Sequence, residues 1–235
     1  MSKYICFNRT DDFSNIVRGI IDTRKQEILD FFEVEDDGRF NFNVYIYDSQ
    51  EELVTGLKER GFSEDPPHMC ACSKDEDHSL NYFEPEDKPV DVNSWSKEEY
   101  LKGNVIFHEE IHGIQSYIYG KQPEWLTEGV AKYLDGTYSK GIPYLLKNYI
   151  SKDQVPSMSE LVSEFGWHQD TYDAYDYAYL IVSYLIDVNG KSGFVKSIYD
   201  SNYLKKLEDS DVVQIAVSYY YDKYDNDEKG LNFKI

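Results

Sequence analysis

The sequence predicts an α+β protein, with an N-terminal mixed β-sheet and helices packed on a mainly helical C-terminal half. Stretches that alternate in polarity or are rich in β-branched and aromatic residues, as strands are, lie before residue 84. Apolar residues at steps of three and four, the spacing of amphipathic helices, dominate the rest of the chain. We place the boundary between the two subdomains after residue 120, which gives ranges 1–120 and 121–235.

The composition indicates a folded chain and excludes some partners. The 235 residues are 41% hydrophobic and 16% aromatic, which suffices for a sizeable core. The net charge of −20 would repel phosphate backbones and anionic membranes, so we expect no nucleic-acid and no membrane partner. A solvated acidic surface, a cationic substrate and an acidic mimic that blocks basic partners are all compatible with this charge.

Cysteine usage and the chain start bear on the compartment. Three cysteines do not make the even set of a disulfide framework. The first residues, MSKYICFNRTDDFS, lack the apolar run of a signal peptide, and no stretch is apolar for long enough to span a bilayer. These features predict a cytoplasmic protein. No pattern indicates an oligomeric state.

The first elements follow from hydrophobic spacing and turn residues. Residues 3–8 alternate weakly and predict a strand, and the apolar residues of 11–32 fall on one helical face. The stretch FNFNVYIYDS from Phe40 predicts a second strand. Ser49 is expected to begin a helix that ends near Arg60.

The turn-rich region that follows contains two short β-like pieces, 68–73 and 80–83, separated by the acidic turn KDEDH. We expect them to pair antiparallel at an edge of the sheet. Four zinc-binding residue types in this region could form a second metal site, although the two cysteines could equally be small buried residues. These residues are His68, Cys70, Cys72 and His78.

The stretch HEEIHGIQ, which begins at His108, lies in a predicted helix over 96–119. His108 and His112 are four apart, so on a helix both imidazoles lie on one face and can reach one metal ion. In an HExxH arrangement the following acid, Glu109, is not a ligand but takes a proton from the attacking water and gives it to the leaving amine. The alternative is that the two histidines only complete a core face.

A second helix is predicted in WLTEGVAKYLDG, from Trp125 to Gly136, and Glu128 lies near its start. A catalytic zinc site has three protein ligands and one open position. A carboxylate from this adjacent helix would therefore complete a His, His, Glu set. The alternative for Glu128 is a solvated acid in a first helical turn.

The pair HEEIH and WLTEG resembles the gluzincin metallopeptidases, the superfamily of thermolysin and the aminopeptidase N family. The resemblance implies a zincin-like active-site helix and one zinc ion per chain, held by His108, His112 and Glu128. It also implies that Glu109 is the general base in the hydrolysis of peptide bonds.

Two features qualify the resemblance. Residues 113–127 form a shorter span between the second histidine and the acid than in the best-known members, so we expect a tight connection. The Gly-x-Met-Glu-Asn motif of the aminopeptidase branch is absent, which disfavours an aminopeptidase. In this superfamily a strand of the N-terminal sheet pairs with extended substrate backbone, and 80–83 is our candidate.

The C-terminal half is expected to be helical throughout. Predicted helices begin at Pro143 and at Ser157 or Ser159, and others cover 171–190, 192–201 and 207–224. Gly190 is expected to stop the third of these helices. The tail after residue 224 is polar and is expected to fray.

The run TYDAYDYAYLIVSYLIDVNG resembles a helix of the same superfamily that begins with Tyr-x-x-small and ends at a glycine. Matching the small residue to Ala178 implies that Tyr175 donates a hydrogen bond to the oxyanion that forms when an amide carbonyl is attacked. Each tyrosine here could instead be an interfacial aromatic residue. The alternatives for the donor are Tyr172, Tyr177, Tyr179 and His168.

Together these features predict a zinc-dependent metallopeptidase that cleaves a peptide or protein substrate through a metal-activated water. Its catalytic residues would be Glu109 and Tyr175. The alternative from another class is a non-catalytic zinc-containing binding or regulatory protein of the same fold. Substrate specificity, and the choice between endopeptidase and exopeptidase, do not follow from the sequence.

Overall fold

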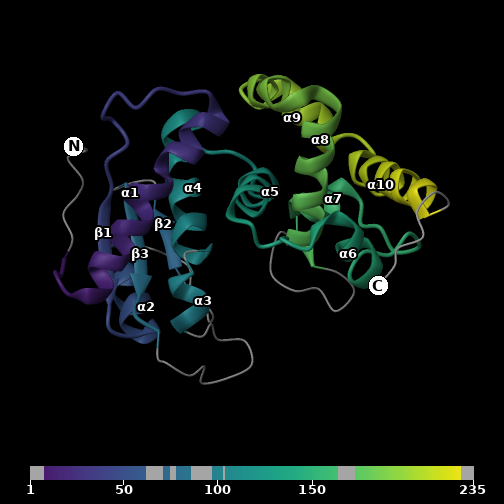
Figure 1. Cartoon of the computed structure of the whole chain (residues 1–235). Coiled ribbons are helices and arrows are strands. Elements are labelled where there is room, and N and C mark those ends of the chain that lie inside the picture. Colours follow the sequence, from purple (N-terminus) through teal and green to yellow (C-terminus); the bar gives the residue numbers. More distant parts are fainter. Residues whose placement is uncertain are drawn as a thin grey trace. The chain divides into compact units, whose positions relative to one another are not determined.

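The computed structural model describes residues 8–61, 71–74, 78–85, 97–102, 104–163 and 173–228. The chain divides into two compact units, Met1–Gly120 and Lys121–Ile235, and each is described by itself. The described part of the first unit contains a small sheet with helices, and that of the second contains helices (Figure 1). The predicted α+β class is confirmed.

The sheet is mixed. Its strands are β1 (Asn43–Tyr47), β2 (Ala71–Lys74) and β3 (Ser79–Phe83), in the order β1-β3-β2. β3 runs parallel to β1 and antiparallel to β2, so the predicted antiparallel pair is confirmed. The prediction that 80–83 is an edge strand is wrong, because β3 has hydrogen-bonded neighbours on both sides. Among the described strands, β2 lies at the edge next to it.

One face of the sheet carries α4 (Asn104–Tyr119), the helix of the HEEIH motif. Leu80 and Tyr82 are buried on this face, and the Tyr82 hydroxyl donates a 3.1 Å hydrogen bond to the carbonyl of Ile106. A Cβ on Gly113 would lie 2.6 Å from the Phe42 ring, so glycine is required for this close approach. These contacts fix α4 against the sheet.

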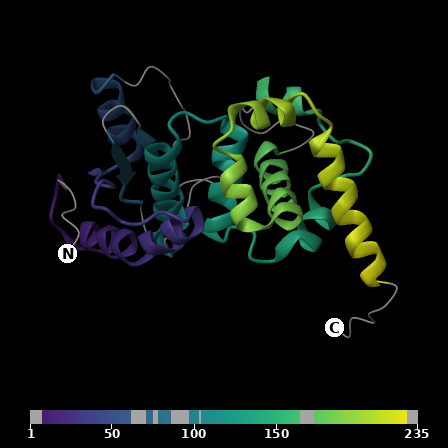
Figure 2. The same cartoon turned by 90° about the horizontal axis from the view of Figure 1, so that it is seen from above.

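Two further helices complete the first unit. α1 (Asp12–Phe32) begins with a capping box at Asp11 and packs against α4, as Figure 2 shows from above. α2 (Gln50–Glu59) covers the opposite face of the sheet, where Gly56 lies against the Tyr47 ring. Both helices follow the predicted ranges within a residue or two.

The predicted helix over 96–119 is wrong in one respect, because the structure has two helices there, α3 (Lys97–Leu101) and α4. Lys102 is a turn residue whose N–H donates to the Glu98 carbonyl. The sequence places Gly103, a poor helix former, between the two helices. The predicted strand over 3–8 lies outside the described residues except for Asn8, whose side chain bonds both the N–H and the carbonyl of Ile46.

The described ranges of the second unit, 121–163 and 173–228, are mainly helical. Their helices are α5 (Glu124–Asp135), α6 (Gly141–Asn148), α7 (Met158–Ser163), α8 (Ala174–Ser197), α9 (Ser201–Glu208) and α10 (Val212–Glu228). Gly190, with φ 69° and ψ 160°, kinks α8 between two helical segments, so the predicted stop at this glycine is a kink with helix on both sides. α9 was not among the predicted helices.

α5 and α8 are the closest pair in this unit. A Cβ on Gly129 would lie 2.5 Å from the Ala178 carbonyl oxygen, so the two backbones nearly touch at this glycine. The Trp125 indole N–H donates a 3.2 Å hydrogen bond to Glu208, which ties α5 to α9. None of the helices in the described ranges combines the length and apolar character needed to cross a bilayer.

Candidate metal centre

α4 holds the two histidines of the motif in fixed positions. Its buried residues Ile106, Ile111 and Ile114 anchor the helix, while His108 and His112 are half-buried. The two Nε2 atoms lie 3.0 Å apart, and the rings are nearly perpendicular, at 83°. Two imidazoles on one tetrahedral zinc, with Zn–N bonds of about 2.0–2.1 Å, would have nitrogens about 3.4 Å apart. The pair therefore needs only a small adjustment to share one ion.

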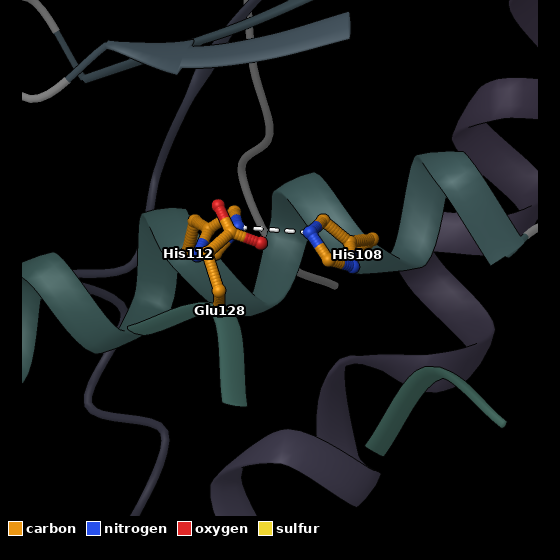
Figure 3. A group of neighbouring side chains, drawn as sticks. All are labelled: His108, His112 and Glu128. Carbon is orange, nitrogen blue, oxygen red and sulfur yellow. Dashed lines mark hydrogen bonds between the residues drawn. The ribbon is translucent and has the colours of Figure 1, made fainter. Parts of the chain in front are cut away.

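The third donor comes from α5. Glu128 is half-buried and lies one turn into the helix, which begins after Pro123 and ends at Gly136 in the left-handed conformation. One nitrogen of each imidazole and one carboxylate oxygen of Glu128 lie within 4.8 Å of one another (Figure 3). This group of His108, His112 and Glu128 could hold a metal ion. Two imidazole nitrogens and one carboxylate oxygen match the donor set of a His₂Glu catalytic zinc site.

Glu109 lies beside the histidine pair. It is half-buried. Each residue of an α-helix turns about 100° from the last, so Glu109 falls between the histidine face and Gly113, which faces the sheet. Its carboxylate is therefore on the sheet side of the two imidazoles. That position suits a base acting on a water between the histidines and a substrate along the sheet.

The second acid of the motif, Glu110, lies on the side of α4 opposite to the two histidines, in a fully buried environment. It is fully buried, and neither carboxylate oxygen has a hydrogen-bond partner among the described residues. Burial raises the pKa of Glu110 well above its ordinary value, although Lys25 of α1 opposes the shift. Burial thus favours the neutral form of Glu110, and its position away from the histidine face makes it no candidate base. Its place on the apolar face, beside Phe107, Ile111 and Ile114, is visible in the sequence but was missed.

Tyr175 occupies the first turn of α8. It is half-buried, and its backbone N–H donates to the side chain of Asp173, the helix N-cap. The Nζ of Lys132, from α5, lies 5.4 Å from the centre of its ring. Since Ala178 lies against Gly129, Tyr175 is placed beside the turns of α5 that carry Glu128 and Lys132. Lys132 was not singled out from the sequence.

The other tyrosines proposed for the donor have other partners or lie outside the description. The Tyr177 hydroxyl donates to the Gln154 carbonyl at 3.2 Å, and the Tyr179 ring stacks on Tyr138 at 4.3 Å. Tyr172 and His168 lie outside the described residues. Of the described candidates, Tyr175 is the one in the first turn of α8, beside Lys132 of α5.

A hydrogen bond between Tyr138 and Asp176 lies next to Tyr175 in the first turn of α8. The Tyr138 hydroxyl donates a 2.5 Å hydrogen bond to Asp176, which is 7% exposed. Burial raises the pKa of Asp176 to about 6, and the bond from Tyr138 opposes this shift. Burial and the nearby Asp176 carboxylate raise the pKa of Tyr138, so the phenol stays protonated.

The possible second metal site is only partly within the description. His68 and Cys70 lie outside the described residues, and of Cys72 only the backbone is described, in β2. His78 is exposed, and its ring stacks on Tyr117 with centroids 4.1 Å apart. The second site stays an untested prediction.

Comparison of the sequence with models of protein families and with curated proteins gives no match.

Proposed function

We propose that this chain is a zinc-dependent metallopeptidase of the gluzincin type, with a zincin-like active-site helix in α4. The observation that carries the proposal is the convergence of His108, His112 and Glu128, with Glu109 beside the two imidazoles. A zinc ion bound by this set would polarise the scissile carbonyl and lower the pKa of a water molecule. The sequence resemblance described above supports the same set.

The protein's own residues would carry the proton transfers. Glu109 takes a proton as water attacks the carbonyl carbon, and it gives that proton to the amine nitrogen as the C–N bond breaks. The products are a carboxylic acid and a free amine, so one water is consumed for each bond. Tyr175 is the proposed donor to the carbonyl oxygen, on which negative charge develops.

The sheet offers a place for the peptide substrate. β2 is one of the two edge strands among those described, with β1 at the other edge, and α4 packs against β2. An extended peptide can add to such an edge through backbone hydrogen bonds. We propose β2 for this role in place of 80–83, which is interior to the sheet.

The proposal is tested by metal content and hydrolysis together. Purified wild-type protein should contain about one zinc per chain by elemental analysis, and His112→Ala should lose it. An unbiased peptide mixture should be cleaved by the wild type. Glu109→Gln should keep the metal and lose about 10²–10⁴-fold in rate, the usual contribution of a general base.

Two outcomes would contradict the proposal. A wild-type chain that takes up no zinc even when supplied with it would show that the ligand set is wrong. A zinc-loaded chain that cleaves nothing in the mixture would favour the non-catalytic binding or regulatory class.

A further inference from the structure

Gln115 is a buried polar residue on α4, the helix that carries the two histidines. It is 0% exposed, and neither its amide nitrogen nor its amide oxygen has a hydrogen-bond partner among the described residues. Burying a carboxamide without hydrogen bonds costs free energy of folding, whereas an apolar side chain of the same length would be buried at a gain. An unpaired amide at such a position therefore indicates a role other than packing.

The position of Gln115 places it on the histidine side of α4. It follows His108 by seven residues and His112 by three. On a helix of 3.6 residues per turn, this spacing corresponds to rotations of about 20° and about 60° from the two histidines. The sheet lies against another side of the helix, where Gly113 approaches the Phe42 ring. Gln115 thus belongs to the side of the proposed metal ligands and not to the contact with the sheet.

Helix geometry directs the Gln115 side chain towards His112. Side chains on an α-helix lean towards its N-terminus, so each of them covers the preceding turn. For Gln115 that turn carries Ile111, which is apolar and buried, and His112, which has a polar ring. Residues three apart on a helix have Cβ atoms about 5–6 Å apart, a gap that a glutamine side chain spans. The imidazole of His112 is therefore within reach of the buried amide.

The two nitrogens of the His112 ring have different tasks in a metal site. The Nε2 atoms of His112 and His108 lie 3.0 Å apart, so these are the nitrogens that face the proposed ion. When Nε2 binds a metal through its lone pair, the hydrogen of the neutral ring is on Nδ1. Histidines that bind a metal almost always donate this N–H to an oxygen acceptor. A carboxamide oxygen is such an acceptor.

We propose that Gln115 is a positioning residue of the metal centre, whose amide oxygen accepts the Nδ1–H of His112 in the zinc-loaded chain. The hydrogen bond fixes the tautomer and the orientation of the ring that binds the metal. The inference rests on the zinc site of the proposed function and does not require peptide hydrolysis. Its thermodynamic signature is that Gln115 destabilises the metal-free chain and strengthens zinc binding.

The first test is the zinc affinity of the full chain, measured by competition with a chromogenic chelator. Gln115→Met has nearly the same length and no acceptor oxygen. It should raise the dissociation constant for zinc about 10–100-fold, the usual effect of losing a hydrogen-bond partner of a metal ligand. Gln115→Glu keeps an oxygen acceptor and should bind zinc more tightly than Gln115→Met.

Glu110→Met is the matched control. Glu110 is also 0% exposed on α4, and its carboxylate has no hydrogen-bond partner in the described part of the chain, but it lies on the side away from the histidines. The substitution removes a buried polar group of similar size and leaves the surroundings of His112 unchanged. This variant should keep the wild-type affinity for zinc.

Melting temperatures separate positioning from packing. Without zinc, Gln115→Met should melt at the temperature of the wild type or above it, because an apolar chain replaces an unpaired buried amide. In excess zinc, the rise in melting temperature should be smaller for Gln115→Met than for the wild type, because its zinc affinity is lower. A residue that only packs would instead lower the melting temperature of the metal-free chain when replaced.

The outcomes distinguish this inference from the proposed function. Equal zinc affinity of Gln115→Met and the wild type would overturn the inference and leave the peptidase proposal intact. A metal-free Gln115→Met that melts well below the wild type would also overturn it, because the amide would then be paired without zinc. A wild type that takes up no zinc would end both proposals. A zinc-loaded wild type that cleaves no peptide, with the expected loss of affinity in Gln115→Met, would support the inference while the peptidase proposal fails.

Discussion

The Nε2 atoms of His108 and His112 lie 3.0 Å apart on successive turns of α4, a separation that one tetrahedral ion could bridge after a small adjustment. A metal that binds the folded chain and not the unfolded chain raises stability with its concentration. The arrangement therefore has a thermodynamic consequence that does not depend on activity.

Zinc is expected to raise the melting temperature of the wild-type chain, with about 2.7 kcal/mol of added stability at 100 times the dissociation constant. His112→Ala should abolish this shift, and Glu128→Gln should shrink it because two imidazoles remain. Glu124→Gln, which removes an exposed acid from the same helix, is the control and should keep the wild-type shift. Differential scanning fluorimetry over a zinc series measures this, and a shift of equal size in His112→Ala would exclude the assigned ligands.

The neighbouring acids Glu109 and Glu110 should respond in opposite ways to replacement by glutamine. Glu110 is fully buried, neither of its carboxylate oxygens has a hydrogen-bond partner in the described part of the chain, and burial raises its pKa well above 4.5. The folded state therefore binds the Glu110 proton more tightly than the unfolded state does. The free energy of unfolding of the wild type consequently falls as the pH rises from about 4.5 towards the pKa of Glu110 in the folded state.

Glu110→Gln is therefore expected to raise the free energy of unfolding at pH 8 by about 1–3 kcal/mol and to leave zinc content and activity intact. Glu109→Gln should lose activity at nearly unchanged stability. Urea unfolding at pH 4.5 and pH 8 measures the difference. If Glu110→Gln were less stable at pH 8 than at pH 4.5, relative to the wild type, the buried acid would have to be ionised and paired.

Individual helices could be predicted from the sequence where one segment contains both the apolar spacing of a helix and the residues that cap its ends. Helix α1 has both an apolar face and an N-cap at Asp11, and α5 ends at Gly136, so their bounds follow from spacing and caps. The histidine pair follows in the same way from a spacing of four. The predicted helix over 96–119 shows the limit, because its apolar spacing continues across Gly103, whereas the structure has two helices there.

Structural features that depend on contacts between segments far apart in the sequence could not be predicted. The place of β3 at the centre of the sheet depends on its pairing with β1, far earlier in the chain, and alternation alone does not tell a central strand from an edge strand. The contact of Lys132 with the Tyr175 ring likewise depends on the packing of α5 on α8. The burial of Glu110 depends on the packing of α1 against α4. The sequence shows only that Glu110 lies on the apolar face of α4.

Asp176, bonded to Tyr138, should make stability fall between pH 4 and pH 6. Burial raises its folded pKa from 3.8 to about 6, so the proton is held more tightly in the folded state. This contribution is complete below pH 3.8 and is lost as the pH rises through about 6, which corresponds to about 3 kcal/mol. Asp176→Asn keeps an acceptor for the Tyr138 hydroxyl and removes the ionisation.

Relative to the wild type, Asp176→Asn is expected to gain stability as the pH rises from 4 to 8, by up to about 3 kcal/mol. Thermal or urea unfolding across this range gives the comparison. Asp153→Asn, at an exposed position, should show no such trend. A constant difference between Asp176→Asn and the wild type at all pH values would mean that Asp176 titrates alike in the folded and unfolded chains.

Gly129, in α5, should tolerate a methyl group poorly. A Cβ there would lie 2.5 Å from the Ala178 carbonyl oxygen and 2.7 Å from Val182, and the first of these is backbone that cannot rotate away. Gly129→Ala is expected to lower the free energy of unfolding by about 1–3 kcal/mol, the usual effect of overpacking. It should also lower zinc affinity, because Glu128 is the preceding residue and moves with α5.

The matched control is Gly19→Ala in α1, where a Cβ meets nothing within 4 Å, so this variant should gain up to about 1 kcal/mol from helix propensity. Urea unfolding and zinc titration of the two variants measure both effects, and equal stability of Gly129→Ala and the wild type would show that α5 and α8 are not in close contact at this glycine.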